Sequence, residues 1–111
     1  MKVARAGQGR RHEAPNHWDY WAMRMHGKEE TGAEKVWVAY VHFLPGGGGK
    51  DDGLPAERIY YILSGSLTLK AGGEEVTLNA GDSVYRPPGE GGEYRNNGVV
   101  PCTNLVIVVP T

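Results

Sequence analysis

The stretch from Pro45 to Gly65, PGGGGKDDGLPAERIYYILSG, restricts the possible folds of this chain more than any other. It contains a glycine-rich loop, a short charged segment and the apolar run Ile59–Leu63, which closes at a Ser-Gly-Ser turn. A second interrupted stretch, Ala80 to Gly98, begins about fifteen residues later. Turn residues at such short intervals leave room for strands but not for helices of several turns.

The chain has 17 glycines and 7 prolines in 111 residues, without a repeat period. No window places apolar residues at helical spacing beyond one turn. We therefore predict an all-β fold of eight or nine short strands. Short strands joined by antiparallel turns are typical of a double-sheet jelly roll or a small barrel.

Alternating and apolar runs locate the main strands, which we predict at His17–His26, Val36–Leu44, Arg58–Leu63 and Thr103–Val109, with a hairpin over residues 67–78. The connection from Pro45 to Pro55 contains four consecutive glycines, which are entropically costly to order. We expect this connection to be mobile, either as a lid or simply as a long loop.

The length fits a single domain, in which residues 1–35 form an N-terminal arm with the first strands and residues 36–111 form the barrel core. Three tryptophans are a large apolar content for so small a chain, and we predict a homodimer on that basis. His12, His17 and the Arg10-Arg11 pair lie in the arm, where we expect a surface or interface role.

Charge and hydropathy argue against two classes of partner. The net charge is −1 with both signs scattered, so no basic stripe suggests a nucleic-acid partner. No apolar run is long enough to span a membrane, and none follows the basic N-terminal residues, so we predict a cytoplasmic protein. Cys102 is the only cysteine, which excludes an intrachain disulfide and a thiolate metal cluster and is typical of a small core residue.

Two motifs resemble those of the cupin family. Gly81, Pro87, Gly89 and Asn96 have the spacing of the second cupin motif, and the strand-turn-strand around Gly65 resembles the end of the first. The resemblance covers about two-thirds of the chain. It implies a small double-stranded β-helix, or jelly-roll barrel, with an internal cavity.

The metal ligands of the family are missing from these motifs. The position of the family's glutamate holds Arg58, and that of its third histidine holds Gly92. The first two histidine positions fall near Asp52 and Leu54, or near Asp51 and Gly53 with the longer spacing. A fixed guanidinium would oppose a divalent cation, so we expect no metal and no other cofactor.

If the family's glutamate position faces the cavity, strand alternation directs a set of ligand-binding side chains inward: Arg58, Tyr60, Ile62, Tyr94 and Asn96. Arg58 could bind a carboxylate, phosphate or enolate oxygen of the ligand, or form an ion pair with Glu57, Asp51 or Asp52. His42, among apolar neighbours near a strand end, is either a buried structural histidine or an acid, base or ligand facing the cavity.

These residues predict a small-molecule-binding cupin, in the first instance a metal-independent isomerase, epimerase or lyase acting on a small oxyacid or keto compound. His42 or Glu57 would move a proton, while Arg58, helped by Tyr60, would stabilise an enolate. One alternative is a non-catalytic binding or sensor module. Another is a metalloprotein with unorthodox ligands drawn from His42, Asp51, Asp52, Glu57 and His26.

Overall fold

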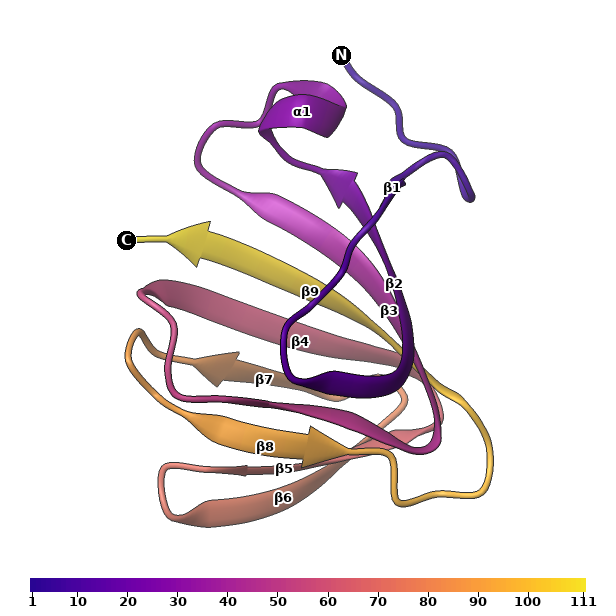
Figure 1. Cartoon of the computed structure of the whole chain (residues 1–111), viewed down its shortest axis with the longest axis vertical. Coiled ribbons are helices and arrows are strands. Elements are labelled where there is room, and N and C mark those ends of the chain that lie inside the picture. The colour runs from indigo at the N-terminus through magenta and orange to yellow at the C-terminus, as the bar shows by residue number, and fades with distance from the viewer.

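The computed structural model describes all 111 residues and consists almost entirely of antiparallel strands (Figure 1). The elements are β1 (Arg10–Arg11), β2 (His17–His26), α1 (Lys28–Thr31), β3 (Trp37–Asp51), β4 (Ala56–Ser64), β5 (Ser66–Ala71), β6 (Glu74–Asn79), β7 (Ser83–Arg86), β8 (Gly92–Arg95) and β9 (Cys102–Pro110). Their order is β6-β5-β8-β3-β9-β4-β7, with β2 on β3 and β1 on β2. The predicted all-β jelly-roll barrel is confirmed.

Strand β3 joins the two halves of the barrel because it changes partners along its length. Residues 37–43 pair with β9, whereas residues 48–51 pair with β8. Strand β2 pairs with both of these parts of β3, so the N-terminal residues form part of the sheet. Figure 1 shows the indigo N-terminal segment running back across the barrel beside β3.

The glycine run does not form the mobile loop that the sequence predicts. Strand β3 continues through it to Asp51, and Gly47, Gly48 and Gly49 are buried. A Cβ on Gly48 would collide with the carbonyl oxygen of Tyr94, and one on Gly49 would lie 2.8 Å from the rings of both His17 and Tyr94. These glycines therefore allow the neighbouring strands to approach closely, which is a common reason for glycine inside a strand.

Side chains alternate between a buried inner face and a more exposed outer face. On β4, Arg58, Tyr60 and Ile62 are buried, while Ile59 and Tyr61 between them are each 41% exposed. The inner-facing apolar residues form one core cluster between the strands. Helix α1 is a single turn without buried residues. It is too short to span a membrane, and the structure contains no long apolar helix that could.

Candidate functional site

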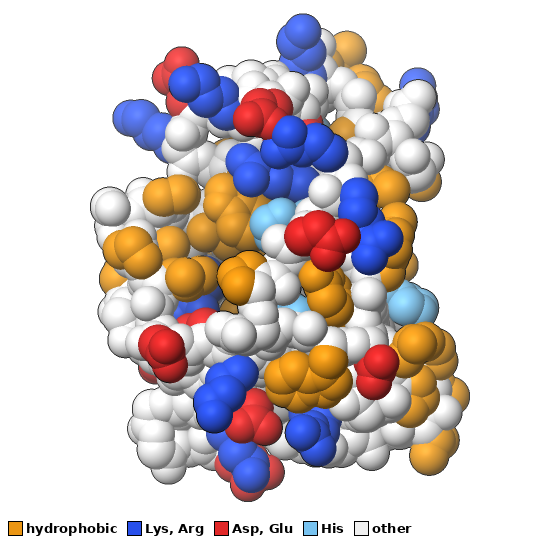
Figure 2. Space-filling view, in the orientation of Figure 1, with side chains coloured by type: hydrophobic (Ala, Val, Ile, Leu, Met, Phe, Trp, Pro, Cys, Tyr) orange, Lys and Arg blue, Asp and Glu red, His pale blue; other side chains and the backbone are white.

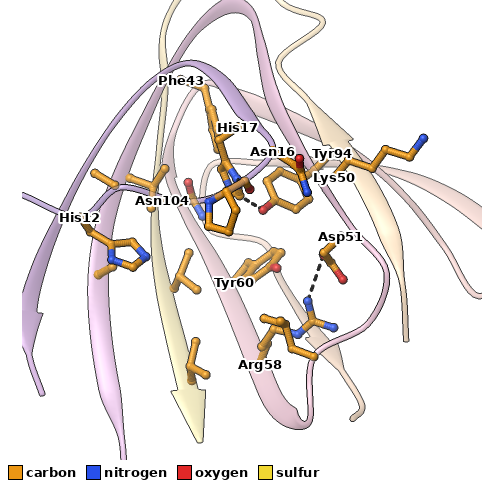
Figure 3. Close-up of a pocket in the computed structure, with 18 of the residues that line it drawn as sticks. His12, Asn16, His17, Phe43, Lys50, Asp51, Arg58, Tyr60, Tyr94 and Asn104 are labelled. Carbon is orange, nitrogen blue, oxygen red and sulfur yellow. Dashed lines mark hydrogen bonds and ion pairs between the residues drawn. The ribbon is translucent and has the colours of Figure 1, made fainter. Parts of the chain in front are cut away.

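A cavity of about 470 Å³ lies inside the barrel, beneath residues 12–17 of the N-terminal arm (Figure 3). More than half of the 22 residues that line it are hydrophobic. Figure 2 shows orange apolar side chains beside pale-blue histidines in the middle of this face, and acidic and basic side chains mixed around them. The cavity therefore suits a small molecule with a mainly apolar body.

His17 and Tyr94 form a hydrogen-bonded pair on the cavity wall (Figure 3). The Nε2 atom of His17 lies 2.6 Å from the Tyr94 hydroxyl, and its Nδ1 atom lies 2.8 Å from the carbonyl oxygen of Pro15. A carbonyl oxygen can only accept, so Nδ1 of the neutral ring carries the proton. Nε2 therefore accepts a hydrogen bond from the Tyr94 hydroxyl.

Burial keeps both members of this pair neutral. It lowers the pKa of His17, although the hydrogen bond to Pro15 opposes this change. It also raises the pKa of Tyr94 well above its ordinary value. A neutral imidazole that accepts from a hydroxyl can take up a proton when that hydroxyl reacts.

An ionic cluster closes another part of the cavity wall. The Oδ2 atom of Asp51 lies 3.1 Å from Nη1 of Arg58 and 3.0 Å from Nη1 of Arg86. Both guanidiniums also donate to the carbonyl oxygen of Glu90. Nη1 of Arg86 donates to the Tyr60 hydroxyl at 3.0 Å, and no protein group accepts the proton of that hydroxyl. Tyr60 is therefore free to donate a hydrogen bond into the cavity.

These residues do not fit a divalent metal ion. Arg58 occupies the position of the family's glutamate, and a Cβ on Gly92 would lie 2.8 Å from Nη2 of Arg86. The space next to Gly92, where the family's third histidine would stand, is thus filled by a second guanidinium. No group of three or more His, Cys, Asp or Glu side chains could hold a metal ion.

The structure brings some of the predicted site residues together and separates others. Arg58, Tyr60 and Tyr94 line the cavity. Ile62 is fully buried in the core, outside the lining. Asn96 is buried as well, but its side chain donates to the carbonyl oxygens of Phe43 and Val100. Its role in the structure is to hold a turn.

His42 and Glu57 lie on the outer face and do not line the cavity, so the cavity-facing alternative for His42 is wrong, and Arg58 rather than Glu57 points inward. On β3 the inward phase belongs to Ala39, Val41 and Phe43, which are all buried, and His42 lies between two of them. Glu57 precedes the inward-facing Arg58 and accepts a 2.7 Å hydrogen bond from the exposed Tyr85.

Three polar residues that line the cavity or support its wall were not expected there. His17 is placed in the arm by the sequence and reaches the cavity only because the arm folds back over it. Arg86 ends β7, directly before the Pro-Pro-Gly stop; it is fully buried behind the lining, where it contacts Asp51 and Tyr60. Asn104 also lines the cavity. The sequence could have indicated this, because Asn104 is a polar residue at an inward-facing position of the mostly apolar strand β9. Cys102, by contrast, is a core residue as predicted, and burial raises its pKa to about 11.

The two histidines at the cavity predict a loss of stability in acid. Burial is the main cause that lowers the pKa of His12, as it is for His17. The unfolded chain then takes up protons below its ordinary pKa of about 6.5 while the folded state does not. Their stabilising contribution is complete above pH 6.5 and decreases as pH falls towards the folded-state pKa values, by at most about 1.4 kcal/mol per histidine and pH unit.

Urea unfolding at pH 7.5 and 5.5 measures this loss. The His12→Gln/His17→Gln double variant is expected to lose less stability between the two pH values than the wild type. An equal loss in both proteins would assign the acid sensitivity to other groups.

Comparisons with known proteins agree with this fold. The family model described as "Cupin domain", Cupin_2, matches residues 39–108. Beta-D-galactosidase Rv1717 of Mycobacterium tuberculosis is 36% identical over 90 residues, which make up 81% of this chain and 78% of that protein.

Solved structures with low sequence identity share the fold. The polyketide cyclase RemF of Streptomyces resistomycificus has a TM-score of 0.85 at 18% identity, over 100% of this chain and 80% of its own. A predicted oxalate decarboxylase of Thermotoga maritima has a TM-score of 0.83 at 22% identity, over 99% of this chain and 100% of its own. With the family match over the barrel and the full-length structural likeness, the chain belongs to the Cupin_2 family of cupin-domain proteins.

Proposed function

We propose that this cupin binds a small carbonyl compound with an apolar body and moves a proton next to the carbonyl group, as an isomerase or lyase that needs no metal. The observation that carries the proposal is the 2.6 Å contact between the Tyr94 hydroxyl and Nε2 of a neutral His17 on the wall of an apolar cavity. His17 and Tyr94 take the roles that the sequence suggests for His42 and Glu57.

In the proposed step, the Tyr94 oxygen accepts a proton from the carbon next to the carbonyl group, while the Tyr94 proton passes to Nε2 of His17. The substrate becomes an enolate and His17 an imidazolium, so charge is conserved. The enolate oxygen accepts a hydrogen bond from Tyr60, whose hydroxyl is polarised by Arg86. Return of the proton to another carbon gives an isomer, and loss of a group from the neighbouring carbon gives an unsaturated product.

The ionic cluster favours a keto compound over an oxyacid. Arg58 and Arg86 already share Asp51 as their counter-ion. A ligand carboxylate would have to displace Asp51 or approach it as a like charge, which costs free energy in a buried site. A neutral carbonyl group needs only the Tyr60 hydroxyl.

The test follows deuterium entering the carbon next to the carbonyl group. Acetophenone, which is neutral, and phenylpyruvate, which is anionic, are incubated with the protein in D₂O and followed by proton NMR. We expect protein-dependent exchange, faster with acetophenone. Saturation-transfer signals from either ketone without any exchange would instead support the non-catalytic binding module.

Hydrolysis of a β-galactoside is a second candidate, because the 36% identical relative is named a β-D-galactosidase. Glycoside hydrolysis usually needs two carboxylates, one of which acts as an acid. Asp51 and Asp52 are the only carboxylates that line this cavity, and Asp51 forms ion pairs with two guanidiniums. Release of nitrophenol from p-nitrophenyl β-D-galactoside, lost in Asp52→Asn, would replace proton transfer as the proposed reaction.

We also propose that the protein is a homodimer formed through the outer face of the barrel. Tyr85, Ile59, Ile107 and Val38 are cross-strand neighbours, so one apolar row crosses four strands. Tyr85 and Ile59 are 52% and 41% exposed in the single chain. Contiguous exposed apolar side chains of this kind are typical of an interface.

Light scattering is expected to give twice the chain mass of 12.1 kDa, and Ile59→Glu is expected to give the single mass. A wild-type protein that stays monomeric at high concentration would contradict the dimer. The cytoplasmic location stays a prediction from the sequence.

A further inference from the structure

Asn104 is a polar side chain without a protein partner on an apolar part of the cavity wall. It is only 1% exposed and lies on β9 between Val41 of β3 and Ile62 of β4. Its Oδ1 atom is buried without a hydrogen-bond partner, and its amide nitrogen donates to no protein group. Buried amides are almost always paired, so this one needs an explanation.

We propose that Asn104 is a specificity residue that binds a hydroxyl group of the substrate. A hydroxyl both donates and accepts, so it can pair with either end of an amide that turns by 180° in place. This inference rests on the proposed function and narrows its substrate class to hydroxylated carbonyl compounds, such as ring-hydroxylated aryl ketones.

The sheet register places Asn104 next to the proposed carbonyl-binding residue, Tyr60. Tyr60 pairs with Val106, and Ile62 pairs with Asn104, so Asn104 is a diagonal neighbour of Tyr60 on the same face. The backbones of diagonal neighbours lie about 7–8 Å apart. Both side chains also line the cavity, so one aryl ketone can contact both, with its carbonyl group at Tyr60 and its hydroxyl at Asn104. Figure 3 shows both side chains among the residues drawn around the cavity, with Tyr94 and His17.

The surroundings favour a flat ring in this position. Phe43 and Tyr94 pack edge to face with ring centroids 5.8 Å apart, and Tyr60 and Tyr94 do so at 5.7 Å. Aromatic side chains in such arrangements offer both faces and edges to a further ring. A hydroxyl at Asn104 would then distinguish this substrate from an unsubstituted aryl ketone, because the amide stays unpaired when the unsubstituted ketone binds.

The experiment compares the binding of acetophenone with that of its meta- and para-hydroxy derivatives. We expect at least one hydroxylated isomer to bind the wild type about tenfold more tightly than acetophenone. Asn104→Leu keeps the volume but removes both polar atoms, and it should abolish that difference. Val106→Ala, the matched control on the same strand, should weaken all three ketones alike.

Thermal unfolding without ligand gives a second readout. Asn104→Leu removes an unpaired buried amide and should raise Tm by about 4 °C. A lower Tm, or a Leu variant that still prefers the hydroxylated ketone, would overturn the role of Asn104. Preferred binding of that ketone without deuterium exchange would count against proton transfer only, and leave the Asn104 site intact.

Discussion

Asp51→Ala is expected to destabilise the folded barrel by about 3–5 kcal/mol, because it leaves the buried Arg58 without a counter-ion and the buried Arg86 with only the Glu90 carboxylate at 3.5 Å. The side chains of Arg58 and Arg86 are 2% and 0% exposed, and both place Nη1 within 3.1 Å of the same Asp51 oxygen. The other carboxylate oxygen accepts from the backbone nitrogen of Gly53, so the variant also loses a turn contact. Urea unfolding at pH 7.5 measures the change.

Asp52→Ala is the matched control for this prediction. Asp52 is the next residue, carries the same charge and is exposed, without an ion pair. Its replacement should change the free energy of unfolding by less than about 0.5 kcal/mol. Similar effects of the two substitutions would mean that Asp51 acts through general charge rather than through the buried guanidiniums.

His17→Gln and Tyr94→Phe are each expected to reduce ketone deuterium exchange by about 100-fold or more, since each removes one half of the proton relay. Tyr94→Phe keeps the ring that packs against Phe43 and Tyr60 and removes only the hydroxyl. The fold should therefore persist, as circular dichroism and thermal unfolding would show. The double variant should be little worse than either single variant, because the two groups act as one unit.

His42→Gln is the matched control for the relay. His42 is a half-buried histidine on the outer face of β3 and does not line the cavity. Its replacement should leave exchange unchanged. Full activity in both relay variants, or a loss in His42→Gln equal to theirs, would contradict the assignment of the relay to His17 and Tyr94.

The pH dependence of exchange follows from the same pair. His17 must be neutral to accept a proton, and burial lowers its pKa. Exchange should therefore be constant above pH 6.5 and decrease only at lower pH, where the imidazole becomes charged.

The fold could be predicted from local patterns because they repeat along the chain. Turn residues separated the strands, and the phase of Arg58 and Tyr60 on β4 followed from the position of the family's glutamate. The phase of β3 could not be fixed in that way. Both of its faces carry apolar and aromatic side chains, so alternation alone could not show that Phe43, rather than His42, points inward.

The candidate site depended on long-range contacts that no local pattern contains. His17 and Tyr94 are 77 residues apart in the sequence and meet because the arm folds across the cavity. The structure of the glycine run also depends on long-range contacts that the local sequence does not show. Its composition indicated flexibility, but the neighbouring backbone and rings require the absence of a Cβ at Gly48 and Gly49.

The most direct test of the central claim measures deuterium exchange into acetophenone after exhaustive dialysis against EDTA, in the wild type and in Tyr94→Phe. The claim is that the cavity moves protons with His17 and Tyr94 instead of a bound metal ion. It predicts that dialysis leaves wild-type exchange unchanged and that Tyr94→Phe loses it with or without added metal. Exchange that disappears on dialysis and returns with a divalent metal ion would contradict the claim.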